Sequence, residues 1–172
     1  MNFRSIVLFA AVLGASFAGT AARAELPSGY KVHDLSAVYA VAEKEQKKVL
    51  VVYTQIRCPP CRFVMGALSR DDVRAAYQDK FVFAEVSLDA PGGRALFKQH
   101  GVRFTPTFAF QTSSQEVVCH SGGFDNAHQG IALAKAVLAT DKPLTGPIAT
   151  RRCSTLMPGH AGTSDNAPTP VQ

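Results

Sequence analysis

The chain is 172 residues long, with 18 lysines and arginines against 13 acidic residues, and it contains four cysteines. This length is enough for one domain with a real core, and the mild positive charge, interspersed with acidic residues, argues against a nucleic-acid partner. Four cysteines are too few for a disulfide-built miniprotein, although an exported chain can use them in disulfide chemistry.

The first 24 residues have the three parts of a secretory signal peptide. Arg4 supplies a positive charge, residues 6–18 contain an apolar run, and Ala22–Ala24 form a small-x-small cleavage site. The apolar run is shorter than the ~20 residues that a membrane-spanning helix needs, which argues against a membrane anchor. We therefore expect a signal peptide over residues 1–24, export to the periplasm, and no membrane insertion after cleavage.

The patterns that follow alternate between helices and strands, over a domain that we place at residues 25–142. Leu35–Glu45 has the apolar spacing of an amphipathic helix, and residues 47–55 form a strand that is apolar on both faces, typical of a central strand in a covered sheet. The remaining predicted elements, in chain order, are helices at about 61–69 and 71–77, a strand at 80–88, a short helix within 92–101, strands within 105–112 and 115–120, and a helix at 126–139. This order predicts a single α/β fold in which helices pack on a sheet.

Residues 143–172 differ in composition from the domain that precedes them. They contain five of the ten prolines, with scattered glycine, serine and threonine and no apolar period. Such a composition is typical of a flexible tail, and we predict one here.

The sequence CPPC at residues 58–61 is compatible with a metal site, a structural disulfide or a redox centre. A zinc site would need two more ligands at regular spacing, and Cys119, His120 and Cys153 are either adjacent or remote. A disulfide that closes so short a loop adds little stability. We therefore favour a redox centre. The alternative is a chaperone that holds copper or zinc on the same cysteine pair, with His120 nearby, since thiolates suit Cu(I).

The position of Cys58 favours the redox interpretation. It follows the strand and precedes a predicted helix, whose free N–H groups and partial positive charge would stabilise a thiolate and lower its pKa. Pro59 suits the first helical position, and Cys61, one turn later, can resolve a mixed disulfide. Arg57 and Arg62 would also favour the anion, whereas the two prolines remove backbone donors. Because these effects oppose each other, the direction of electron flow stays open.

A second motif lies at RFTPTFAF, where Pro106 opens a strand that otherwise looks internal. Proline is out of place in such a strand unless it is the first residue. A cis Thr105–Pro106 bond would turn the chain sharply toward the cysteines and leave the Thr105 backbone groups free to pair with an extended substrate. A trans proline at a strand start is the alternative, and this motif alone does not exclude it.

Together these features resemble the thioredoxin superfamily. The match runs from about Leu35 to Leu138, and the sequence RCPPCRFVMGALSRDDVRAAYQDKFVFAEVSLD is similar to exported thioredoxin-like domains such as the C-terminal domain of the bacterial transmembrane thiol reductase. The resemblance implies a thioredoxin fold, with a central mixed sheet flanked by helices on both faces, and a thiol-disulfide oxidoreductase that needs no cofactor. It also implies Cys58 as the attacking thiol, Cys61 as the resolving thiol and Pro106 as the cis-proline.

The same resemblance implies protein thiols and disulfides as substrates, and it favours a reductant that is recharged by a membrane thiol reductase. The chain departs from the family in two places: the tryptophan before the first cysteine is Arg57, and the buried acid of thioredoxins falls on Val52. Proton transfer at Cys61 would then use water or another group. Glu85, an isolated acid in the neighbouring strand, which we predict to be central, is the candidate. The simpler interpretation of Glu85 is an acid at a strand edge that reaches solvent.

The other two cysteines are Cys119, at the end of a predicted strand, and Cys153, in the tail. In an oxidising compartment two spare cysteines are more often paired than free, so we predict a structural bridge between them. A buried free Cys119 with a loose Cys153, or a second exchangeable pair, are the alternatives. A bridge would join the tail to the sheet.

Overall fold

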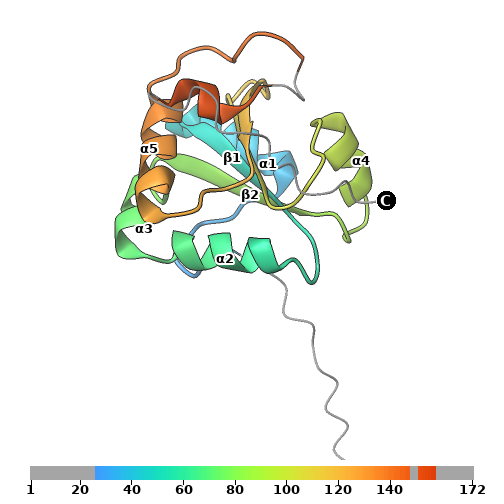
Figure 1. Ribbon diagram of the computed structural model, residues 1–172. Coiled ribbons are helices and arrows are strands. Elements are labelled where there is room, and N and C mark those ends of the chain that lie inside the picture. Colours follow the sequence, from blue (N-terminus) through green and yellow to red (C-terminus); the bar gives the residue numbers. More distant parts are fainter. Residues whose placement is uncertain (1–25, 148–150, 158–172) are drawn as a thin grey trace, which may run out of the picture.

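The centre of the fold is a mixed four-stranded sheet (Figure 1). The computed structural model describes residues 26–147 and 151–157. The strands are β1 (Lys48–Thr54), β2 (Phe81–Ser87), β3 (Thr107–Gln111) and β4 (Val117–Ser121). They lie in the order β2-β1-β3-β4, with β1 parallel to β2 and with β1–β3 and β3–β4 as antiparallel pairs. The predicted α/β thioredoxin fold, with a mixed sheet, is confirmed.

Helices cover both faces of the sheet. The helices of the described residues are α1 (Leu35–Glu45), α2 (Pro59–Leu68), α3 (Asp71–Tyr77), α4 (Gly93–Gln99), α5 (Ala127–Leu138) and the short 3-10 helix η2 (Cys153–Leu156). Buried side chains of α2, α3 and α5 share one core with one face of the sheet, and those of α1 and α4 share a second core with the other face. Figure 1 shows α4 on the opposite side of the sheet from α3 and α5.

Strand β1 is buried on both faces, as its sequence predicts. Leu50 and Val52 belong to the core under α2, α3 and α5, whereas Val49, Val51 and Tyr53 belong to the core under α1 and α4, and all five are 0% exposed. Full burial of a side chain of this size stabilises the folded state by about 1.5–3 kcal/mol. The strand is therefore a rigid support for the loop that follows its last residue.

Residues 151–157, which belong to the predicted tail, lie beside β4. The His120 N–H donates to the Arg151 carbonyl at 2.7 Å, and the Arg151 guanidinium donates to the Val117 carbonyl at 2.6 Å. Cys153 is 0% exposed and is disulfide-bonded to Cys119. The edge of β4 offers backbone groups that need partners, and the disulfide keeps residues 151–157 beside them, which composition alone does not reveal.

Two further predictions concern residues that lie wholly or partly outside the described part of the chain. The signal peptide at residues 1–24 lies entirely outside it, as do residues 148–150 and 158–172 of the predicted tail. Within residues 26–147 and 151–157, no helix combines the length and the apolar character that crossing a membrane would require.

Candidate active site

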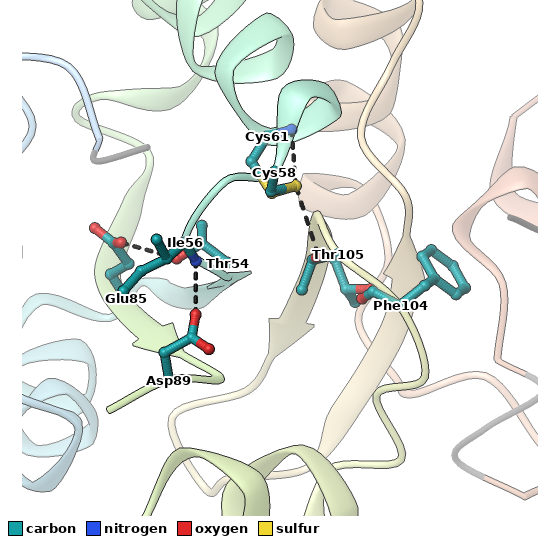
Figure 2. The surroundings of a disulfide bond; sticks show 9 residues. Thr54, Ile56, Cys58, Cys61, Glu85, Asp89, Phe104 and Thr105 are labelled. Carbon is teal, nitrogen blue, oxygen red and sulfur yellow. Dashed lines mark hydrogen bonds between the residues drawn. A yellow bond between two sulfur atoms is a disulfide. The ribbon is translucent and has the colours of Figure 1, made fainter. Parts of the chain in front are cut away.

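Cys58 and Cys61 form a disulfide at the start of α2, directly after the loop that leaves β1 (Figure 2). Cys58 is the N-cap residue of the helix, and Pro59 and Pro60 fill its first two positions. Proline lacks a backbone N–H, so these two residues leave the Cys61 N–H as the first donor of the helix. That N–H donates to Cys58 Sγ at 3.1 Å.

The two cysteines differ in exposure. Cys58 is 4% exposed and Cys61 is 0% exposed. Both residues are buried, and Cys58 is the member of the pair that keeps some exposed surface. The sequence predicts Cys58 as the attacking thiol and Cys61 as the resolving thiol, and this assignment stays a prediction.

The surroundings of Cys58 favour a negative charge on its sulfur in the reduced protein. The helix start supplies one N–H donor and the positive end of the α2 dipole. Arg57 and Arg62 are exposed, and no ion pair engages either of them within the described residues. Arg57 has a φ of 60°, a left-handed conformation that is uncommon for a residue other than glycine. This conformation forms part of the loop that delivers Cys58 to the helix start.

Thr105 and Pro106 lie opposite the disulfide, as Figure 2 shows for Thr105. The Thr105–Pro106 peptide bond is cis, and Pro106 is buried directly before β3. The Thr105 hydroxyl donates to Cys58 Sγ at 3.5 Å. Within the described residues, the backbone N–H and C=O of Thr105 form no hydrogen bond. Residues 47 positions apart in the sequence thus meet at one sulfur atom.

Glu85 lies in β2, which is an edge strand of the sheet and not the central strand that we predicted. Because Glu85 pairs with Val52 in the register, its side chain lies on the sheet face that α2 covers. Thr54 Oγ1 donates to its carboxylate at 3.0 Å, and Figure 2 draws Thr54 between Glu85 and the disulfide. Glu85 is half-buried, so a role in proton transfer to Cys61 stays a prediction.

Two exposed apolar side chains close to CPPC in the sequence and one acid that binds the loop before Cys58 were missed by sequence reasoning. Ile56 is 43% exposed and Phe63 is 59% exposed. The Asp89 carboxylate accepts the Ile56 N–H at 2.6 Å and so holds the loop that precedes Cys58. No sequence signal separates Ile56 and Phe63 from core residues, but Asp89 directly follows a buried strand, which is where a loop-binding acid is expected.

The second disulfide joins Cys119 in β4 to Cys153 in η2, and both residues are 0% exposed. A buried pair is inaccessible to a partner thiol, so this geometry fits a structural bridge better than an exchangeable one. Among the described residues, no group of three histidine, cysteine or acidic side chains is arranged to hold a metal ion. His120 lies in β4 beside this second disulfide.

A cysteine pair at a helix start, on a β2-β1-β3-β4 sheet and facing a cis-proline, places the protein in the thioredoxin-fold class. The family assignment follows from a comparison with known protein families. The model of the thioredoxin-like domain matches residues 35–137, which is more than half of the chain, and the chain belongs to this family. The fold and the cysteine pair are those of a thiol-disulfide oxidoreductase.

Solved structures have the same fold. A thioredoxin from Thermus thermophilus is 25% identical, with a TM-score of 0.58, and the match covers 64% of this chain and 88% of that chain. A putative disulphide-isomerase from Bacteroides thetaiotaomicron is 24% identical, with a TM-score of 0.56 and coverage of 66% and 94%. The C-terminal domain of DsbD from Neisseria meningitidis, in its reduced form, is 19% identical, with a TM-score of 0.50 and coverage of 58% and 90%. No curated protein sequence matches the chain.

Proposed function

We propose that this protein is an exported thiol-disulfide oxidoreductase that exchanges disulfides with protein substrates through Cys58. The observation that carries the proposal is the asymmetry of the pair: the Cys58 sulfur faces Thr105 and accepts the first N–H of α2, while Cys61 is fully buried behind it. An exchange centre needs one reachable sulfur with a stabilised thiolate and a second sulfur that only the first can meet.

The exchange has two steps. In the reduced protein the Cys58 thiolate attacks one sulfur of a substrate disulfide, the substrate S–S bond breaks, and the other substrate sulfur leaves as a thiolate that takes up a proton. Cys61 then loses its proton and attacks Cys58 Sγ, which forms the Cys58–Cys61 bond and releases the first substrate sulfur as a thiol. Two electrons pass to the substrate, so a dithiol donor must return the protein to its reduced state.

A protein chain fits the surroundings of Cys58 better than a small thiol does. The Thr105 N–H and C=O, without partners among the described residues, can pair with an extended backbone. Ile56, two positions before Cys58, and Phe63, two positions after Cys61, offer exposed apolar surface. Contacts of both kinds are those that a polypeptide around a reactive cysteine can make.

We further propose a reductant role in the periplasm, with a membrane thiol reductase as electron donor. The predicted signal peptide supports export, and the resemblance of residues 57–89 to exported thioredoxin-like domains supports the direction. The measured reduction potential tests it: a value near about −270 mV fits a reductant, whereas a value near about −120 mV would make the protein an oxidant. Fractionation of cells that express the full chain tests the location.

Trapping tests the exchange itself. A Cys61→Ser variant should accumulate mixed disulfides with partner proteins through Cys58, and a Cys58→Ser variant should accumulate none and should reduce insulin no faster than the background. The wild-type protein should reduce insulin when a dithiol is supplied. Stoichiometric copper or zinc on the reduced wild-type protein, with no insulin reduction, would overturn the proposal in favour of a metal chaperone.

A further inference from the structure

A cavity of about 500 Å³ opens beside the candidate active site, between α4 and the loop that leads to Pro106. Gln55, which precedes the Cys58 loop, and Thr105 are among the residues that line it. Since the Thr105 hydroxyl also contacts Cys58 Sγ, the cavity and the reactive sulfur share one residue. A chain that is bonded to Cys58 and paired with Thr105 needs only a few residues, at about 3.3 Å each, to enter the cavity.

Three cations surround this cavity. Arg94 and Lys98 lie one turn apart on α4, and Arg103 lies in the loop before Thr105. All three side chains are exposed, and none of them forms an ion pair within the described residues. No carboxylate is among the described residues that line the cavity. Three like charges around one hollow create a positive potential that attracts an anion.

The apolar part of the cavity lining, which we call its floor, consists of Leu88, the buried Phe97 and Val102, and Phe104. A bare inorganic anion gains nothing from such a floor, whereas a glutamate or aspartate side chain brings methylene groups and a backbone that can cover it. The nearby Asp89 is engaged with the Ile56 N–H and does not line the cavity.

We propose that this cavity binds an acidic segment of the protein substrate, next to the cysteine that exchanges with Cys58. The inference rests on the proposed exchange function and names its substrate class: proteins whose reactive cysteine is flanked by glutamate or aspartate. Arg94, Lys98 and Arg103 select the substrate by charge, and Thr105 holds its backbone.

Exchange kinetics with charged peptides test the inference. Three peptides of equal length carry one cysteine, as a mixed disulfide with thionitrobenzoate, flanked on both sides by glutamate, glutamine or lysine. The reduced protein attacks the peptide sulfur and releases the coloured thionitrobenzoate. We expect the glutamate peptide to react about tenfold faster than the glutamine peptide at low salt, and the lysine peptide to be slowest. The advantage should shrink at 1 M salt, where the Debye length is about 3 Å.

A matched pair of variants separates the effect of the cavity cations on the exchange rate from the effect of the protein's net charge. Arg94→Gln/Lys98→Gln/Arg103→Gln should lose most of the glutamate advantage while reacting with the glutamine peptide within about twofold of wild type. The control Lys44→Gln/Lys135→Gln/Lys142→Gln removes the same charge from exposed lysines that do not line the cavity, and it should keep the advantage. Arg57 and Arg62 stay in both variants, so they cannot explain a difference. Equal behaviour of the two triple variants would overturn the inference.

A binding measurement separates this inference from the proposed exchange function. The glutamate peptide with serine in place of its cysteine should shift the NMR amide signals of Lys98, Gly101 and Arg103 in the wild-type protein, and the glutamine peptide should not. The same saturable shifts with inorganic phosphate alone would overturn a peptide site. If the wild type released thionitrobenzoate from none of the peptides, the exchange function would fail. If it reacted equally fast with all three, exchange would stand and the acidic-segment site would fail.

Discussion

Reduction of the buried Cys119–Cys153 disulfide should strongly destabilise the folded protein, even in a variant that lacks the Cys58–Cys61 pair. The perturbation is best made in a Cys58→Ser/Cys61→Ser variant, which leaves the second disulfide as the only one and is compared with itself, oxidised and reduced. No side chain is deleted between the two measurements. Any difference in the free energy of unfolding therefore belongs to that bond.

The expected magnitude follows from the loop that the bond closes. Cys119 and Cys153 are separated by 34 positions in the sequence. Loop-closure entropy for that length gives about 4 kcal/mol of stabilisation at 25 °C. With an m-value of about 2 kcal/mol/M in urea, the unfolding midpoint should fall by about 2 M on reduction. The Arg151 contacts to His120 and Val117 depend on the same clamp and should weaken with it.

Urea unfolding monitored by circular dichroism measures this shift, and mass spectrometry after alkylation shows which state each sample is in. Hydrogen exchange adds a local measurement, because the His120 amide that donates to Arg151 should lose protection first. A reduced sample with both thiols alkylated, and a midpoint within about 0.3 M of the oxidised sample, would refute the reasoning. The bridge would then join two segments that hold together without it.

Three further predictions concern single residues. A Cβ at Gly93 would lie 2.0 Å from the Ser87 carbonyl oxygen, so Gly93→Ala should lower the free energy of unfolding in urea by about 1–3 kcal/mol. The control Gly66→Ala places its Cβ in open space beside α2 and should leave the free energy of unfolding unchanged or raise it by up to about 1 kcal/mol. Burial lowers the pKa of His120 to about 4 from its ordinary 6.5, so between these pH values the unfolded chain binds a proton that the folded protein does not. The free energy of unfolding should therefore fall by up to about 3 kcal/mol between pH 6.5 and pH 4. In His120→Gln the urea midpoint should depend less on pH across that window, and an unchanged pH dependence would exclude His120 as the cause. Glu85→Gln should slow insulin reduction without changing the unfolding midpoint, and an unaltered pH–rate profile would remove Glu85 from the mechanism.

The local sequence patterns were sufficient to predict the strand and the helix start that carry Cys58 and Cys61. Five consecutive apolar or aromatic residues, 49–53, predict a strand buried on both faces, and Cys58 followed by Pro59 predicts a helix start. Both predictions depend on side-chain chemistry and on neighbours within one turn, which the sequence states directly. The position of β2 at the sheet edge depends instead on strand order. The apolar pattern of residues 81–87 would suit a central strand equally well, so it does not distinguish a central strand from an edge strand.

The sequence by itself determined the α/β fold, the redox pair and its helix start, because each is set by short-range pattern and by the preferences of cysteine and proline. Only the tertiary structure decided that Thr105 meets Cys58, that residues 151–157 pack against β4, and that Arg94, Lys98 and Arg103 surround one cavity. These juxtapositions join segments from different elements. They depend on how the strands and helices pack around the two cores, and no local pattern encodes the distance between side chains so far apart in the chain.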